Sequence, residues 1–218
     1  MEHNFNLSMP TPLEKARKDP DSMKAKILCA ARDLFAEYGY HGVTTRMIAK
    51  NVNIDISTLH YHWGDKENLY EAVLDDLNDE IEEKFKEIES VVRGKSLAYR
   101  LEVAIDVMCD YLFERPAAAK LVMFSHFLKT RAPGVLDERL IKQVSNIAFA
   151  MGLAPNKEGV SASANARVLA VSNAIYSFVA GEDFMRKILK VDKPEYNRVI
   201  RDTLKFILIP AFTRSEDS

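Results

Sequence analysis

The side chains best suited to contact another molecule lie close together, between positions 57 and 62. Hydroxyl, imidazole and phenol groups follow one another there: Ser57, Thr58, His60, Tyr61 and His62. Such groups can hydrogen-bond the edges of nucleic-acid bases, contact thymine methyls or hold phosphate oxygens. We expect Ser57, Thr58 and Tyr61 to read base edges. The two histidines, and Tyr61 as an alternative, could instead hold the phosphate backbone.

Further candidates flank this segment. Thr44 and Thr45 open a helical pattern, and the free N–H groups in the first turn of a helix favour a phosphate. Arg46, in the same turn, can fork onto a guanine edge or neutralise a phosphate. Lys66 falls in the first turn of a later helix, where we expect it to bind a phosphate. The net charge of −2 supplies no general basic field, so these placed residues must provide any affinity for DNA.

Two short helices joined by a tight turn would position these side chains. Thr44 is a favourable N-cap for the first helix, Asn53 tolerates the left-handed conformation that ends it, and Asp55 can cap the second. In the second helix, Leu59 and Trp63 return to the apolar side at helical spacing, which leaves the polar side chains on the open face. This is the helix-turn-helix pattern, whose second helix enters the major groove of DNA.

The same region resembles the N-terminal domain of the tetracycline-repressor (TetR) family of bacterial regulators. Five short stretches carry the resemblance: Phe35 to Gly39, Thr44-Thr45, Ile48-Ala49, Thr58 to Trp63, and Lys66 to Leu69. Asn53 replaces the usual turn glycine, and His60 replaces the usual tyrosine. The resemblance implies a ligand-responsive DNA-binding transcriptional regulator, most simply a repressor that binds a palindromic operator as a dimer.

The predicted fold class is all-α, with a three-helix head joined by a long helix to a C-terminal helical domain. Residues 1–20 hold three of the eight prolines and no apolar period, so we expect a flexible tail there. The DNA-binding domain should span 21–81, with its helix-turn-helix at 44–63, and the effector-binding and dimerisation domain should span 82–218. After a connecting helix of about 25 residues, helical spacing predicts helices at 96–114, 117–130, 134–151, 161–180 and 194–212.

The resemblance also implies a ligand cavity in the second domain. Its candidate lining is mostly apolar with a few hydrogen-bonding groups: Met108, Tyr111, Met123, His126, Phe127, Asn146 and Tyr176. This composition favours a lipophilic or aromatic effector over a polyanion, although the same side chains would also suit a plain core.

The last two predicted helices are candidates for a homodimer interface. Thr203 to Phe212 is apolar nearly all round, which is more than one contact face requires. A partner subunit would cover the second face, as the resemblance implies; the alternative is the central helix of a monomeric core.

Catalytic and metal-binding templates were sought without success. Gly94-Lys95-Ser96 ends like a phosphate-binding loop but lacks the earlier glycine, and no zinc, di-iron, serine-elbow or thiol-redox motif occurs. We therefore expect no enzyme activity, cofactor or metal; a helical protein-binding adaptor or a small helical enzyme is the alternative. No run of 18 apolar residues and no signal peptide is visible, so we expect a cytoplasmic protein without a membrane partner.

Overall fold

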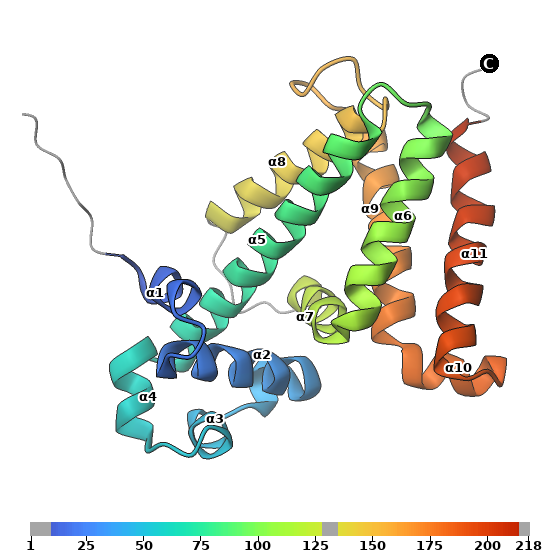
Figure 1. Ribbon diagram of the computed structural model, residues 1–218. Helices are drawn as coiled ribbons and strands as arrows, with labels where there is room; N and C mark the ends of the chain where they lie inside the picture. The colour runs from blue at the N-terminus through green and yellow to red at the C-terminus, as the bar shows by residue number, and fades with distance from the viewer. Residues whose placement is uncertain (1–9, 128–134, 214–218) are drawn as a thin grey trace, which may run out of the picture. The chain divides into compact units, whose positions relative to one another are not determined.

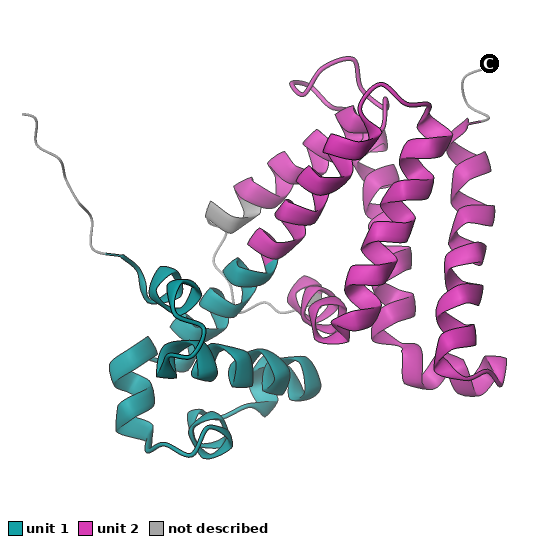
Figure 2. Ribbon diagram, viewed as in Figure 1, with its two compact units in different colours: residues 1–77 teal, residues 78–218 magenta. Residues whose placement is uncertain are grey.

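The computed structural model describes residues 10–127 and 135–213, and these are helical throughout apart from their connections (Figure 1). The chain divides into two compact units, residues 1–77 and 78–218 (Figure 2). The described helices are α1 (Pro12–Lys18), α2 (Met23–Gly42), α3 (Thr45–Asn51), α4 (Ile56–Trp63), α5 (Lys66–Val92), α6 (Leu97–Glu114), α7 (Pro116–Phe127), α8 (Val135–Ala150), α9 (Ala162–Ala180), α10 (Glu182–Leu189) and α11 (Lys193–Thr213). The predicted all-α fold class is confirmed.

The head, unit 1, is organised by local capping signals and a small shared core. The hydroxyl of Thr44 caps α3, and the carboxylate of Asp55 accepts the backbone N–H of Thr58 at 2.8 Å to cap α4. Asn53 takes the left-handed φ of 56° that the turn between them requires. Ile48 of α3 and Leu59 of α4 are fully buried, together with side chains of α2 and α5. The helix-turn-helix predicted for this segment is therefore present.

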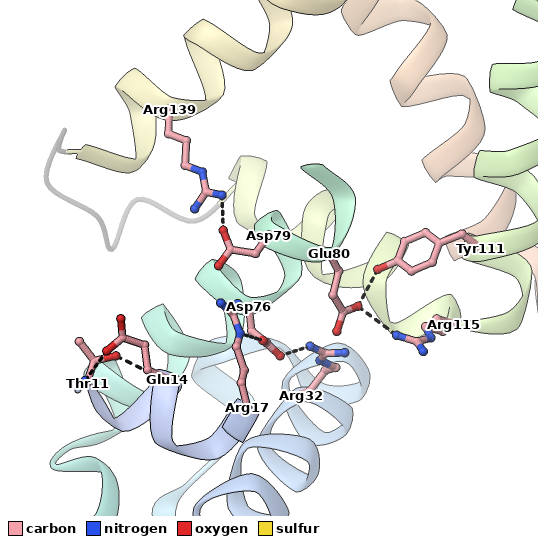
Figure 3. A network of polar contacts seen from close by, with 10 residues as sticks. All are labelled: Thr11, Glu14, Arg17, Arg32, Asp76, Asp79, Glu80, Tyr111, Arg115 and Arg139. Atoms are coloured by element: carbon pink, nitrogen blue, oxygen red, sulfur yellow. Dashed lines mark hydrogen bonds and ion pairs between the residues drawn. The ribbon is translucent and has the colours of Figure 1, made fainter. Parts of the chain in front are cut away.

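The N-terminal segment differs from the expected tail. Residues 12–18 form helix α1, which begins with a capping box: Thr11 and Glu14 exchange backbone-to-side-chain hydrogen bonds of 2.7 and 3.2 Å. Arg17 at the other end of α1 binds the Asp76 carboxylate of α5 at 2.8 Å, and Arg32 of α2 binds its second oxygen (Figure 3). The expectation of a flexible tail is wrong for α1, because these contacts fix it in the head. Residues 1–9 lie outside the described part of the chain.

The second unit is a helical bundle in which α6, α9 and α11 run alongside one another (Figure 1). Hydroxyl caps start two of these helices: Ser96 accepts the N–H of Tyr99 before α6, and Ser161 accepts that of Ala164 before α9. Helix α10 was not predicted. Among the described helices, none is both long and apolar enough to cross a membrane.

Candidate nucleic-acid interface and ligand cavity

Helix α4 has one face in the core and one face open to solvent. Leu59 is fully buried and Trp63 is 5% exposed, and the indole Nε1 of Trp63 donates to the carbonyl oxygen of Lys24 at 3.2 Å. Tyr61, on the other side of the helix, is 82% exposed. Ser57 and His60 are also exposed, while Thr58 and His62 are half-buried. The structure therefore places Ser57, His60 and Tyr61 on the open face of α4, whereas Thr58 and His62 are partly covered.

Several of these side chains are held in place by neighbours. The hydroxyl of Ser57 donates to Asp55 at 2.5 Å, and this bond with that from Thr58 lowers the pKa of the Asp55 carboxyl. Nδ1 of His60 lies 2.7 Å from the carbonyl oxygen of Gly64. Since a carbonyl only accepts, Nδ1 carries the proton and Nε2 is left for another partner.

His62 is fixed from the head itself. The ammonium of Lys24 lies 3.2 Å from Nδ1 of His62 and donates to the His62 carbonyl oxygen at 3.1 Å. Partial burial first, and then this neighbouring cation, lower the pKa of His62. The imidazole is consequently neutral over a wider range of pH than a free histidine, and its Nε2 edge is the one not bound to Lys24.

The remaining predicted DNA contacts differ in how they are engaged. Arg46 and Thr44 are exposed, Thr45 is half-buried, and the Thr44 hydroxyl accepts the N–H of Met47 at 3.2 Å. Lys66 is used within the head: its ammonium donates to the carbonyl oxygens of Tyr40 at 3.1 Å and Val43 at 3.0 Å and lies 4.1 Å from the centre of the Tyr40 ring. The phosphate contact predicted for Lys66 stays a prediction, and the structure adds a role in holding the end of α2.

Unit 2 contains a cavity of about 720 Å³ between α5, α6, α8 and α9. Its buried wall is apolar and includes Ile105 and Ile175. Three of the predicted pocket residues line it: Met108, Asn146 and Tyr176. Burial raises the pKa of the Tyr176 phenol to about 12, so this group stays protonated at neutral pH and can act as a hydrogen-bond donor.

Tyr111, Met123 and His126 are not in this lining. The hydroxyl of Tyr111 donates to Glu80 of α5 at 2.8 Å, beside Arg115, which binds the same carboxylate at 3.2 Å (Figure 3). Met123 and His126 lie on α7, which packs on α9, and none of the described side chains of α7 lines the cavity. The side chain of Phe127 lies outside the described part. The sequence could not exclude these residues from the lining, because helical spacing shows that a helix is apolar but not which of its faces turns toward the cavity.

Sequence reasoning missed the charged part of the lining. Six cationic side chains border the cavity, together with the carboxylates of Glu82 and Glu89: Lys86, Arg93, Arg100, Arg139, Lys142 and Lys157. One sequence signal for it was the pair Arg93 and Lys95 directly after α5. Within the described residues, no group of three or more histidine, cysteine or acidic side chains could hold a metal ion.

The head and the bundle together define a helix-turn-helix protein of the all-α class. Residues 27–73 match the family model described as bacterial regulatory proteins, tetR family. Over 49 residues the chain is 49% identical to IcaR of Staphylococcus aureus, a biofilm operon negative transcriptional regulator. This stretch is 22% of the chain and spans about a quarter (26%) of the relative's length.

Solved structures share the fold over most of the chain. The structure of AibR in complex with isovaleryl coenzyme A and operator DNA matches with a TM-score of 0.64 at 19% identity, over 84% of this chain and 96% of that one. The fatty acid degradation regulator FadR from Bacillus halodurans matches with a TM-score of 0.54 at 14% identity, over 84% and 93%. At these identities the similarity establishes the fold.

Proposed function

We propose that the protein is a transcriptional repressor that binds a palindromic operator as a homodimer in the cytoplasm. A small lipophilic molecule in the cavity of unit 2 releases it from DNA. The observation that carries the proposal is the division of α4: Leu59 and Trp63 hold the helix in the head, which leaves Tyr61 and its neighbours free to enter a major groove. Arg46, exposed at the start of α3, is placed to add a phosphate or base contact.

Exposed apolar side chains on the last helices support the dimer. In the single chain, Phe206 is 80% exposed and Ile207 56% exposed on α11, and Leu169 of α9 is 44% exposed. Burying a side chain of this size contributes about 1.5–3 kcal/mol, so a second copy seated here would be stabilised substantially. A twofold dimer would present two copies of α4 to the two halves of a palindrome.

The cavity supports control by a ligand. A lining that is largely apolar with a few polar groups is typical of small-molecule sites, and the volume lies within the range of such sites. AibR, which shares this fold, has been solved with operator DNA and isovaleryl coenzyme A together. If the effector lowers operator affinity, operator DNA must lower effector affinity by the same factor.

Selection of DNA fragments by the purified protein tests the proposal. We expect the enriched fragments to share a palindrome, to bind two chains per site, and to lose affinity steeply as salt rises, because bound phosphates release counterions. Enrichment of no common sequence, or binding that is insensitive to salt, would contradict the proposal. A lipophilic effector should then release the selected fragment.

A further inference from the structure

The cavity of unit 2, which is the proposed effector site on which this inference rests, has two chemically different parts: one is apolar and the other is cationic. The apolar part is buried, with Ile105 1% exposed and Met108 4% exposed. Most of the cations that border it, among them Lys142 and Lys157, are exposed. The cations therefore lie toward solvent and the apolar side chains lie deeper.

Half of these cations are neutralised by the protein. Arg139 binds Glu82 at 2.7 Å and also binds Asp79. Lys86 lies 2.8 Å from Glu83 and 3.3 Å from Glu82. The guanidinium of Arg93 lies 3.7 Å from Glu89. These pairs account for the acidic groups of the lining.

The other three cations are Arg100, Lys142 and Lys157, and none of them is paired with a carboxylate in the part of the chain that the structure describes. Arg100 donates to two neutral carbonyl oxygens, those of Lys95 and Ala150, each at 2.8 Å. These bonds orient its guanidinium without cancelling the charge. The ammonium of Lys157 lies 5.7 Å from the centre of the Phe149 ring.

Two of the uncompensated cations gather at one end of the cavity. Arg100 is in the first turn of α6, and its bond to Ala150 ties that turn to the last residue of α8. Lys157 follows in the connection from α8 to α9 (Figure 1). Met108 lies eight residues further along α6, which is about 12 Å of helix. A molecule that reaches from Arg100 to Met108 would meet positive charge first and apolar side chains afterwards.

We infer that the cavity takes an amphiphilic anion, with its anionic head at Arg100 and Lys157 and its apolar chain along Ile105 and Met108. A cationic amphiphile would be repelled by Arg100 and Lys157, and a small polar anion would leave the apolar part of the cavity unfilled. A neutral alcohol of equal length would fill the apolar part without meeting the charges. The head could be a carboxylate or a phosphate-bearing group, since the same cations bind both.

Calorimetric titration of the purified full chain without DNA tests the inference. The probes are decanoate, decanoyl-coenzyme A, decanol, decyltrimethylammonium and free coenzyme A, each below its micellar concentration. We expect at least one of the two decanoyl anions to bind saturably, decanol to bind at least tenfold more weakly, and the cation and free coenzyme A not to bind. Shortening the better anion should weaken binding about fourfold per methylene.

The variant Lys157→Gln should weaken binding of that anion about two- to fivefold, as expected for one exposed ion pair, and leave decanol unchanged. Lys187→Gln, which changes an exposed lysine of α10 outside the cavity lining, is the matched control. Tighter binding of decanoate assigns a carboxylate head, and tighter binding of the thioester assigns a phosphate-bearing head.

The inference is overturned if no decanoyl anion binds, if decanol or the cation binds as tightly as the anions, or if Lys157→Gln binds the better anion like the unmodified protein. None of these results would contradict the proposed binding of DNA. Conversely, a protein that binds the anions but selects no DNA would uphold this inference and contradict the proposed repressor function.

Discussion

The substitution Lys66→Met separates a structural role of this lysine from a role in phosphate binding. The ammonium donates to the carbonyl oxygens of Tyr40 and Val43 and lies over the Tyr40 ring. Hydrogen bonds that involve a charged group are worth about 1.5–3 kcal/mol each when buried, and a cation–π contact adds about 0.5–1 kcal/mol. Because Lys66 is half-buried and water can replace part of these bonds, we expect the substitution to lower the free energy of unfolding of the head by about 2 kcal/mol.

Trp63 makes this loss measurable in the head alone, since it is the only tryptophan of the chain and is buried in unit 1. With a urea dependence of about 1–2 kcal/mol per molar, the midpoint followed by its fluorescence should fall by about 1–2 M. Lys50→Met, at an exposed lysine of α3, is the control and should leave the midpoint in place. An unchanged midpoint for Lys66→Met would refute the structural role and leave only the phosphate contact.

Three further predictions concern other parts of the molecule. Asp76→Asn removes the carboxylate that two arginines share and should destabilise the head by about 1–2 kcal/mol in the same urea titration. Phe206→Glu should convert the proposed dimer to monomers in light scattering, because the change charges the proposed interface. Since the pKa of His62 is lowered in the folded state, the stability linked to it is complete above about pH 6.5 and falls as pH drops below that value. His62→Gln should flatten this pH dependence of the urea midpoint.

Much of the head could be predicted from the sequence because its signals are local. Thr44, Asn53 and Asp55 each act within a few residues of their own position, as caps or as a left-handed turn residue, and the structure confirms all three. Helix α1 had a local signal too. Thr11 and Glu14 have the spacing of a capping box, and Pro12 suits the first turn of a helix, so one of the three prolines that suggested a tail in fact begins a helix.

The cavity could be predicted only in part because its lining depends on which way each helix faces. Met108 and Asn146 lie on helices that border it. Helix α7 is apolar on nearly all sides, so periodicity could not show that Met123 and His126 lie outside the lining. The charged border was also hidden, because Arg100 reaches Ala150 across 50 residues of sequence.

Contact between the open face of α4 and DNA can be measured by fluorescence anisotropy on a selected palindromic fragment. Tyr61→Ala and Arg46→Ala change exposed side chains, so both variants should keep the fluorescence of a buried Trp63 and the urea midpoint of the unmodified protein. We expect both variants to lose binding to the fragment. Folded variants that bind it as tightly as the unmodified protein would show that this face of α4 does not contact DNA.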